Sequence, residues 1–386
     1  MIKREAEHYL LKLASQFRAV AVVGPRQSGK STLVKALFKD KPYVSLENPD
    51  TLLFATSDPR GFLANYPKGA ILDEVQRVTP IFNYLQEILD NSDEDGLFIL
   101  TGSNNFLLQE KISQSLAGRI GYLDLLPFSF GEYSKFNNSK ISLNYFIKKG
   151  SYPEIYHKKR DENIWYANYI RTFVERDVRQ ILNISNSNLF TKFLKICAGR
   201  VGQLLNVTAI SNECGIDQKT TNAWLSILQQ SFIIYLLPPY FNSFNKRITK
   251  TPKLYFIDSG LACTLLNIKT DEELQYSHFR ESLVENQVVM ELLKQNYNHG
   301  IQAEFSFWRE NNGVEIDLII EKGSETIPIE IKSSQTFKKD FIKNLTKFKK
   351  YSGITKNYVL YDGKSEFLWL EETQVLNWKN FHLIEL

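Results

Sequence analysis

The sequence predicts a multidomain α/β protein, and three observations support this prediction. An apolar run at residues 19–23 leads directly into a glycine-rich loop and an apolar helix, as in a buried parallel sheet. Helical segments and a hairpin follow in the middle of the chain, and the last third contains alternating strands with acidic residues. At roughly 100–200 residues per domain, 386 residues correspond to more than one domain.

The composition is that of a globular chain, with 43% hydrophobic and 23% charged residues. These values exclude the disordered, collagen-like and low-complexity classes. The net charge of +4 conceals an uneven distribution, because residues 131–200 contain 13 Lys/Arg and only 6 Asp/Glu. A basic middle is compatible with an anionic partner but does not identify one.

Membrane insertion and secretion are not expected from this sequence. The longest apolar run, residues 232–241, contains two prolines and is too short to span a bilayer, and the chain opens on a charged amphipathic segment. The three cysteines, Cys197, Cys214 and Cys263, are odd in number and form no C-x-x-C pair. We therefore expect a reducing, cytoplasmic location and no membrane partner.

The glycine-rich loop matches the pattern G-x-x-x-x-G-K-[ST] between a predicted strand and a predicted helix. The residues expected to bind nucleotide are Gly24, Pro25, Arg26, Gln27, Ser28, Gly29, Lys30, Ser31 and Thr32. Glycines let successive N–H groups point at phosphate oxygens, and the following helix adds its dipole. Lys30 is expected to reach the β- and γ-phosphates, and the Ser31 hydroxyl is expected to bind Mg²⁺.

A second apolar strand, residues 70–74, ends in two carboxylates. Asp73 is expected to hold Mg²⁺ directly or through water, and Glu74 is expected to polarise the attacking water. An acidic turn in solvent is the alternative for an isolated pair of this kind. The neighbouring glycine-rich loop favours the catalytic interpretation.

Two further strands of this sheet are expected at residues 43–47 and 97–103. The second ends in polar residues, so Ser103, or Asn104 beside it, is expected to sense the γ-phosphate and orient the water. Ordinary turn chemistry is an equally good interpretation of Thr101 and Ser103.

These motifs, in this order, resemble the AAA+ ATPases. More narrowly, they resemble a prokaryotic family that joins such an ATPase to a C-terminal domain of unknown function related to PD-(D/E)xK nucleases. The segments that carry the resemblance are GPRQSGKST, SLENP, ILDEVQRV, FILTGSN and SLAGRIGYLDLLPFSFGEY. The resemblance implies ATP and Mg²⁺ as cofactors, a P-loop ATPase core at residues 1–130 and a helical lid at 131–196.

The same resemblance implies roles for two arginines, an arginine finger and one lid arginine. Arg119 lies about where AAA+ proteins carry an arginine finger, which acts in trans and would require a homo-oligomer. A surface arginine is the alternative. In the lid, Arg171 and Arg176 are both candidates to contact the γ-phosphate, and their spacing does not decide between them.

The segment 197–270 is predicted to be a winged helix-turn-helix, because short helices precede two strands joined by a basic hairpin. The residues expected to face DNA are Gln218, Lys219, Thr220 and Asn222 on the third helix and Lys246, Arg247 and Lys250 on the hairpin. A packing or oligomerisation module is an equally open interpretation.

The last segment, 271–386, is predicted to be an α/β domain. Asp317, followed by Glu330-x-Lys332 on the next strand, resembles the core of PD-(D/E)xK nucleases, and Glu285 matches the helix acid of that superfamily. The resemblance implies a second Mg²⁺ or Mn²⁺ held by the carboxylates, with Lys332 either lowering the pKa of a metal-bound water or stabilising the charge that develops on phosphate. Alternating charges on a solvated strand are the alternative, and this fold also serves as a non-catalytic module.

Three functional hypotheses remain open. The first is an AAA+ ATPase that couples ATP hydrolysis to a task on nucleic acid through the winged helix and the nuclease-like tail. The second is a regulatory or scaffold ATPase whose tail binds partners without cleavage. The third is a nucleotide-gated defence-type nuclease.

Overall fold

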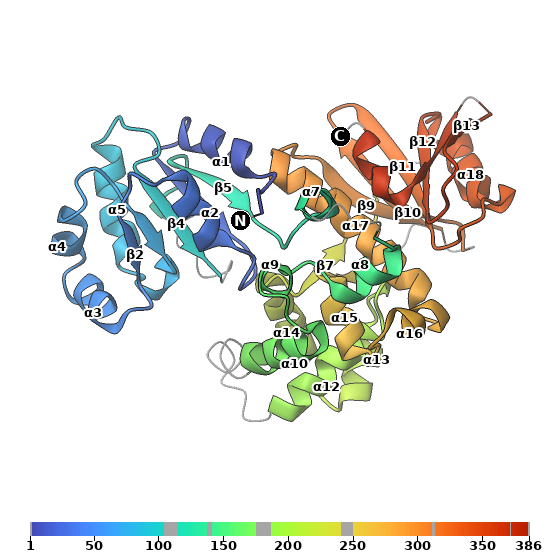
Figure 1. Ribbon diagram of the computed structural model, residues 1–386, viewed down its shortest axis with the longest axis horizontal. Coiled ribbons are helices and arrows are strands. Elements are labelled where there is room, and N and C mark those ends of the chain that lie inside the picture. Colours follow the sequence, from blue (N-terminus) through green and yellow to red (C-terminus); the bar gives the residue numbers. More distant parts are fainter. Residues whose placement is uncertain are drawn as a thin grey trace. The chain divides into compact units, whose positions relative to one another are not determined.

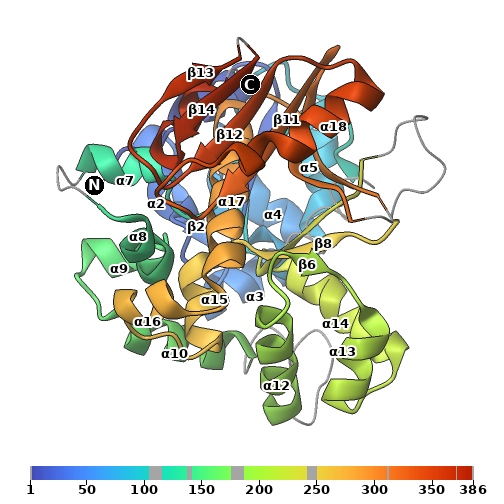
Figure 2. The same cartoon turned by 90° about the vertical axis from the view of Figure 1, so that its right-hand side faces the viewer.

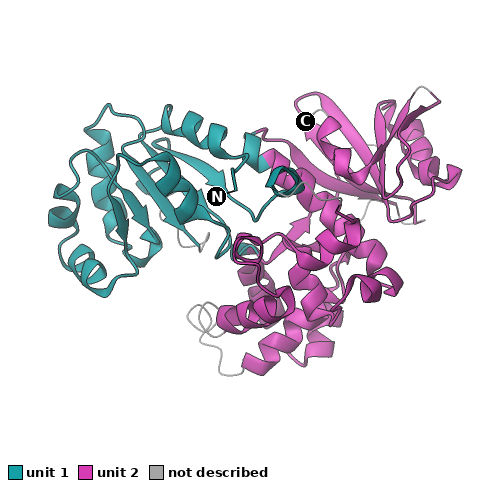
Figure 3. Ribbon diagram, viewed as in Figure 1, with its two compact units in different colours: residues 1–136, 230–232, 297–300 teal, residues 137–229, 233–296, 301–386 magenta. Residues whose placement is uncertain are grey.

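The computed structural model describes residues 2–103, 115–136, 141–174, 187–240, 250–310, 313–370 and 372–384. The chain divides into two compact units (Figure 3). Unit 1 comprises residues 1–136, 230–232 and 297–300, and unit 2 comprises the rest. The division after residue 136 lies close to the expected end of the ATPase core at 130. The expected boundaries at 196 and 270 both lie inside unit 2.

Unit 1 is built on a parallel five-stranded sheet (Figure 1). Its strands are β1 (Ala19–Val23), β2 (Tyr43–Ser45), β3 (Ile71–Asp73), β4 (Phe98–Gly102) and β5 (Ile120–Asp124), in the spatial order β2-β3-β4-β1-β5. The predicted parallel α/β fold of this region is therefore confirmed, and β5 is an additional edge strand. Because β4 lies between β3 and β1, its carboxyl end is adjacent to both the Asp73–Glu74 strand and the glycine-rich loop.

Helices of unit 1 precede, connect and follow these strands. They are α1 (Glu7–Ala14), α2 (Lys30–Leu37), α3 (Pro49–Ser57), α4 (Pro59–Ala64), α5 (Ile81–Asp90) and α7 (Phe130–Phe136), with a 3₁₀ turn η1 (Val75–Arg77). The core joins Leu10 and Leu13 of α1 and Leu33 and Val34 of α2 to β1. Burial of these apolar faces, rather than intrinsic helix propensity, stabilises helices as short as eight residues.

The first half of unit 2 is mostly helical. It contains α8 (Leu143–Lys149), α9 (Pro153–His157), α10 (Glu162–Thr172), α12 (Ser187–Ala198), α13 (Val207–Cys214), α14 (Gln218–Gln230), α15 (Ser259–Leu265) and α16 (Asp271–Tyr276). A small antiparallel sheet has the order β6-β8-β7, formed by Gln203–Leu204, Lys253–Phe256 and Ile234–Leu237 respectively. Trp224 of α14 contacts Phe190 and Phe193 of α12 with ring centroids 5.0 and 5.2 Å apart, which fixes α14 against α12.

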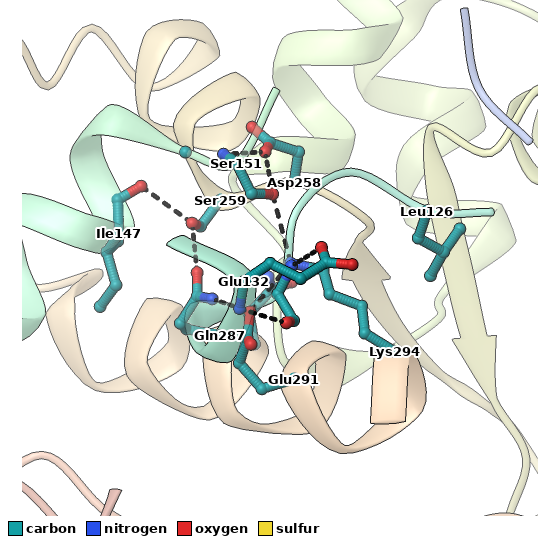
Figure 4. Close-up of polar contacts among 12 residues, drawn as sticks. Leu126, Glu132, Ile147, Ser151, Asp258, Ser259, Gln287, Glu291 and Lys294 are labelled. Atoms are coloured by element: carbon teal, nitrogen blue, oxygen red, sulfur yellow. Dashed lines mark hydrogen bonds and ion pairs between the residues drawn. The ribbon is translucent and has the colours of Figure 1, made fainter. Parts of the chain in front are cut away.

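A buried polar network joins the segment after β8 to α17 (Arg280–His299) (Figure 4). Asp258 accepts hydrogen bonds from the Ser151 amide at 2.7 Å and the Ser151 hydroxyl at 2.8 Å. The Lys294 ammonium donates to Ser151 at 3.2 Å and to Glu291 at 2.8 Å, and Gln287 also donates to Glu291. Buried charges need such partners, so this network defines one arrangement of the segment after β8 relative to α17.

The second half of unit 2 contains a six-stranded mixed sheet in the order β13-β14-β12-β11-β10-β9 (Figure 2). The strands are β9 (Glu304–Arg309), β10 (Glu315–Lys322), β11 (Glu325–Lys332), β12 (Asn357–Tyr361), β13 (Phe367–Trp369) and β14 (Thr373–Asn377). The turn η3 (Lys339–Ile342), helix α18 (Lys343–Ser352) and the turn η4 (Trp378–Leu383) complete the unit. Leu345 and Phe348 of α18 are buried in the same cluster as Trp308 and Ile316.

In the described ranges, no helix is both long and apolar enough to cross a membrane. All three cysteines are buried and free, so none contributes a disulfide.

Candidate functional sites

The glycine-rich loop connects β1 to α2 in backbone conformations that favour glycine. Gly24 has φ 152° and Gly29 has φ 96°, and Gln27 also has a positive φ of 62°. A Cβ atom on Gly24 would lie 2.2 Å from the Leu125 carbonyl oxygen, so no side chain fits there. Ser28 is fully buried, Arg26 is partly exposed, and Gln27 and Thr32 are exposed.

Lys30 is the buried cation of this loop, with an exposed fraction of 5%. Its ammonium donates to the Gly24 carbonyl at 2.9 Å and to the Pro25 carbonyl at 2.8 Å. Burial lowers the pKa of Lys30 to about 8, although the nearby Glu74 and Asp73 carboxylates partly offset this effect. A phosphate would offer this ammonium anionic acceptors in place of two neutral carbonyls, which favours the charged form.

Asp73 connects the loop helix to the neighbouring strands. Its Oδ1 accepts from the Ser31 hydroxyl at 2.8 Å and also from the Thr101 hydroxyl, and its Oδ2 accepts from the Tyr43 hydroxyl at 2.5 Å. The two residues expected to bind Mg²⁺, Ser31 and Asp73, are therefore in contact. Thr101 is a partner of Asp73 rather than a turn residue.

Tyr43 is a residue of this site that the sequence did not predict. Burial, and then the Asp73 carboxylate, raise the pKa of its hydroxyl, so Tyr43 remains a donor to Asp73. Tyr43 begins β2, and β2 pairs in parallel with β3, the strand that ends at Asp73. Knowledge of this pairing could have identified Tyr43 as a neighbour of Asp73.

Glu74 leaves β3 in a left-handed conformation with φ 57° and ψ 44°. Such a backbone costs a non-glycine residue on the order of 1 kcal/mol and is common at functional sites. The Glu74 carboxylate accepts from the Ser103 hydroxyl at 2.9 Å and from the Gln76 amide. Ser103 thus lies against Glu74, and Asn104, its alternative, lies outside the described residues.

Arg119 is far from Lys30 of the same chain. It immediately precedes β5, where Ala19 pairs with Ile120, whereas the loop follows the opposite end of β1. A five-residue strand spans roughly 17 Å. The Arg119 guanidinium instead pairs with Asp90, with Nη2 and Oδ2 3.1 Å apart. Its action in a neighbouring subunit stays a prediction.

The lid arginines are described only in part. Arg171 is exposed on α10 of unit 2, and Arg176 lies outside the described residues. The choice between them therefore stays open.

Arg4 is a second residue that the sequence did not predict. Its guanidinium donates to the Ser28 carbonyl at 2.7 Å, to the Leu126 carbonyl at 2.7 Å and to the Glu132 carboxylate at 2.9 Å. Arg4 and Glu132 are both buried. This group ties the glycine-rich loop to the segment after β5. Its partners are 24 to 128 residues away in the chain, so no local pattern indicates them.

In unit 2 the structure brings together the four residues of the predicted nuclease-like site. The Lys332 ammonium lies 3.3 Å from Asp317 Oδ2 and 2.5 Å from Glu330 Oε2. Asp317 Oδ2 also accepts a hydrogen bond from the Ile331 amide at 2.8 Å, just beyond Leu318 and Ile329, where the regular pairing of β10 with β11 ends. Glu285 of α17 offers an oxygen within 4.8 Å of one from Asp317.

Three more residues, which the sequence did not predict, complete this acidic site. Glu315, two residues before Asp317 on β10, offers a third carboxylate oxygen within the same 4.8 Å. Lys253 of β8 pairs with Glu285 at 2.8 Å and also with Glu315. The Tyr255 hydroxyl donates to Glu285 at 2.6 Å. Residues 253 and 255 share one face of β8 because strand side chains alternate.

The carboxyl and ammonium groups of the acidic site shift one another's pKa. Burial raises the pKa of Glu285, and burial together with Asp317 raises that of Glu330 well above its usual range. Burial opposes ionisation of Asp317, yet Lys332 and Lys253 hold its pKa below the usual value. Burial also disfavours the charged form of Lys253, but Glu285 and its neighbours raise the pKa overall. Lys253 and Asp317 are therefore both ionised near neutral pH.

Four of the predicted DNA-facing residues, Gln218, Lys219, Thr220 and Asn222, lie on α14. Gln218, Lys219 and Asn222 are exposed, and Thr220 donates to Asp217, the residue that precedes the helix, at 2.7 Å. Lys250 is exposed before β8, whereas Lys246 and Arg247 lie outside the described residues.

Comparison with known proteins identifies three regions. The model of an AAA domain matches residues 16–134. Models of two domains of unknown function, DUF8612 and DUF4143, match residues 140–272 and 280–381. The AAA match and the geometry of the glycine-rich loop together define the class of residues 16–134, which is an AAA-type ATPase domain.

Several relatives are similar along most of the chain. An uncharacterized protein of Mycobacterium tuberculosis is 26% identical over 339 residues, which cover 86% of this chain and 74% of that protein. An uncharacterized protein of Methanocaldococcus jannaschii is 25% identical over 362 residues, with 83% and 76% covered. A Walker-type ATPase structure from Pyrococcus abyssi has a TM-score of 0.47 and 17% identity, covering 69% of this chain and 96% of that one.

Proposed function

We propose that this protein hydrolyses ATP in a Mg²⁺-dependent reaction in which Glu74 activates the attacking water. The observation that carries this proposal is the contact of the Ser31 hydroxyl with the Asp73 carboxylate, directly beside Glu74 and behind the phosphate-binding loop. Hydroxyl and carboxylate oxygens are the ligands that Mg²⁺ prefers.

The residues present fit both ATP and Mg²⁺. The backbone at Gly24 leaves no room for a Cβ, which would lie 2.2 Å from the Leu125 carbonyl oxygen, and Lys30 is the only buried lysine among the described residues of the loop and α2. Bound Mg²⁺ would neutralise charge on the phosphates. Ser31 and Asp73 would hold this ion, and Tyr43 and Thr101 orient Asp73.

In this proposal Glu74 is the general base and Ser103 positions it. Glu74 accepts a proton from the water that attacks the γ-phosphorus, and Ser103 holds the Glu74 carboxylate in place. Such a base contributes about 10²–10⁴-fold to the rate.

The Lys30→Ala variant tests the phosphate site. We expect ATP affinity, measured by isothermal titration calorimetry, to fall by about 100-fold or more, because Lys30 is the loop's point charge for phosphate. Lys39→Ala, which alters an exposed lysine just after α2, is the matched control and should bind normally. Equal affinity in both variants would refute the assignment.

Arg119 is proposed to complete the site of a neighbouring subunit, because it lies at the opposite end of the sheet from the glycine-rich loop of its own chain. Mixing inactive Lys30→Ala with inactive Arg119→Ala protein should restore part of the ATPase activity. In mixed oligomers, an intact loop then meets an intact Arg119. A mixture without activity, from two variants that each form oligomers, would contradict the trans role.

A second candidate function is metal-dependent cleavage of nucleic acid at the acidic site. One observation favours it. Glu330 is 1% exposed and its Oε1 has no hydrogen-bond partner among the described residues, although its other oxygen contacts Lys332. A buried carboxylate oxygen without a donor has a high desolvation cost, which a divalent cation would offset.

In this reaction Asp317, Glu330 and Glu285, together with Glu315, would hold the metal, which would supply a nucleophilic water. Lys332 would stabilise charge that develops on the phosphate. The elements α12, β6, α13, α14, β7 and β8 follow the order of a winged helix, and the exposed residues Gln218, Lys219 and Asn222 of α14 are proposed to contact DNA.

Cleavage assays with Mg²⁺ or Mn²⁺ on single-stranded DNA, double-stranded DNA and RNA, with and without ATP, separate the alternatives. Asp317→Asn should reduce cleavage by about 100-fold or more, whereas Asp340→Asn, an exposed control in the same unit, should not. Cleavage only with ATP would support a nucleotide-gated nuclease. No cleavage under any condition would support a regulatory ATPase whose tail binds partners.

A further inference from the structure

Lys253 is an internal cation in the acidic site. It is 1% exposed and belongs to β8, whereas its partners Glu285 and Glu315 belong to α17 and β10. Its ammonium contacts Oε1 of Glu285 at 2.8 Å and Oε1 of Glu315. Its ammonium nitrogen also lies over the Phe307 ring, 5.4 Å from the centroid.

The oxygens around Lys253 have the spacing of a cation site. One oxygen each from Glu285, Glu315 and Asp317 lie within 4.8 Å of one another. Two oxygens on opposite sides of a divalent cation are about 4–5 Å apart, because Mg–O and Ca–O distances are about 2.1 and 2.4 Å. A metal ion and the Lys253 ammonium would therefore contact the same carboxylates.

We propose that the Lys253 ammonium and a divalent cation are alternative occupants of the site formed by Glu285, Glu315 and Asp317. Lys253 keeps the site neutralised when no metal is bound, and metal binds only as Lys253 withdraws. This inference rests on the proposed metal-dependent function of the acidic site. It adds control of metal binding by Lys253, which is not one of the four nuclease-like residues.

The charge balance supports this exchange. Lys253 is the ammonium in contact with Glu285 and Glu315, whereas Lys332 contacts Asp317 and Glu330. Arg309 adds a cation to Glu315 at 2.8 Å, but its side chain is 41% exposed and solvent screens it. Removing Lys253 therefore leaves buried carboxylates that lack a cation, and a divalent metal restores the balance.

The unpartnered Glu330 oxygen belongs to a side chain beside this site, because Lys332 contacts both Glu330 and Asp317. Lys253 pairs with Glu285 and Glu315, and Lys332 pairs with Asp317 and the other oxygen of Glu330. Glu330 Oε1 is left without a donor among the described residues. Tyr255 remains bound to Glu285 through its hydroxyl, so Glu285 keeps one partner when Lys253 leaves.

The test is Mn²⁺ binding to the nucleotide-free full chain, measured by electron paramagnetic resonance. Lys253→Met should bind Mn²⁺ about 10- to 1000-fold more tightly than the wild type, because one unit charge about 4 Å away no longer competes. Lys364→Met, which removes an exposed lysine of the same unit, should match the wild type. Asp317→Asn measures the Mn²⁺ binding that does not depend on the acidic site, including any binding near the glycine-rich loop.

The outcomes separate this inference from the proposed function. Equal, Asp317-dependent Mn²⁺ affinity in the wild type and Lys253→Met would refute the exchange and leave the metal site standing. No Asp317-dependent binding in any variant would refute both the exchange and the metal-dependent function of the acidic site.

A second measurement needs no variant at residue 253, in case Lys253→Met does not fold. Acetylation of lysines in the wild type, quantified by mass spectrometry, should increase several-fold at Lys253 when Mn²⁺ is added, because the displaced ammonium becomes accessible. Lys364 should react equally with and without Mn²⁺. Unchanged labelling of Lys253 while Mn²⁺ binds in an Asp317-dependent manner would overturn the proposal.

Discussion

Replacing Arg4 with methionine removes the guanidinium that joins the glycine-rich loop to Glu132 and Leu126. Breaking a buried ion pair by deleting one partner costs about 3–5 kcal/mol, because the remaining charge is left uncompensated. Glu132 would keep two backbone donors, Glu5 N at 2.7 Å and Ser129 N at 2.9 Å. We therefore expect Arg4→Met to destabilise unit 1 by about 3–4 kcal/mol, the lower part of this range.

The assay must report on unit 1 alone, because a chain with two units need not unfold in one step. All five tryptophans lie in unit 2, so tryptophan fluorescence does not monitor the loop. Hydrogen exchange of peptides from β1 and α2, read by mass spectrometry, does so. ATP affinity should fall in parallel, because the Ser28 carbonyl loses its donor and the loop is no longer held.

Lys135→Met is the matched control for Arg4→Met. Lys135 also pairs with an acid of unit 1, Glu5 at 3.0 Å, but its side chain is 73% exposed. An exposed pair contributes less than about 1 kcal/mol. Equal losses of protection in the two variants, or normal protection in Arg4→Met, would refute the view that Arg4 holds the loop.

Three further predictions concern the nucleotide site. The pKa of Lys30 is about 8 in the free protein and higher next to phosphate, so ATP binding takes up a proton above pH 8. The ATP affinity measured by calorimetry should therefore be constant below pH 8 and fall by up to tenfold per pH unit above it. An affinity that does not change with pH would contradict this. Gly24→Ala places a Cβ 2.2 Å from the Leu125 carbonyl oxygen and should abolish the thermal shift that ATP produces, whereas Gly118→Ala, whose Cβ would meet nothing within 4 Å, should keep it. Tyr43→Phe removes the 2.5 Å hydrogen bond to Asp73 and should raise the Mg²⁺ concentration for half-maximal ATPase activity several-fold, while an unchanged Mg²⁺ dependence would argue against a role for Tyr43.

The sequence predicts the nucleotide site well because its parts are local. The strand, the loop and the first turn of α2 are contiguous, and Asp73 and Glu74 end a strand that is apolar along its length. The edge strand β5 lacks this signal, since it contains Gly121 and the exposed Tyr122. β5 is stabilised by its parallel pairing with β1, a contact that the local sequence does not show.

The contacts that the sequence misses are those made over long distances. Lys253 reads as an ordinary strand residue, and its partners Glu285 and Glu315 are 32 and 62 positions later in the chain. Arg4 is one of several charges in an amphipathic segment, and only tertiary contacts distinguish it from its exposed neighbour Lys3. Alternation identifies the face of Glu330 and Lys332, but not which side chain of another element will cover that face.

The most direct test of the central claim is a parallel measurement of ATP binding and ATP turnover in Glu74→Gln. Glutamine keeps the size and the hydrogen-bonding oxygen for Ser103 but removes the base, so ATP affinity should stay within about twofold while turnover falls about 10²–10⁴-fold. ATP should then remain bound and uncleaved on the variant. Normal turnover in Glu74→Gln, with ATP bound as in the wild type, would show that another group activates the water.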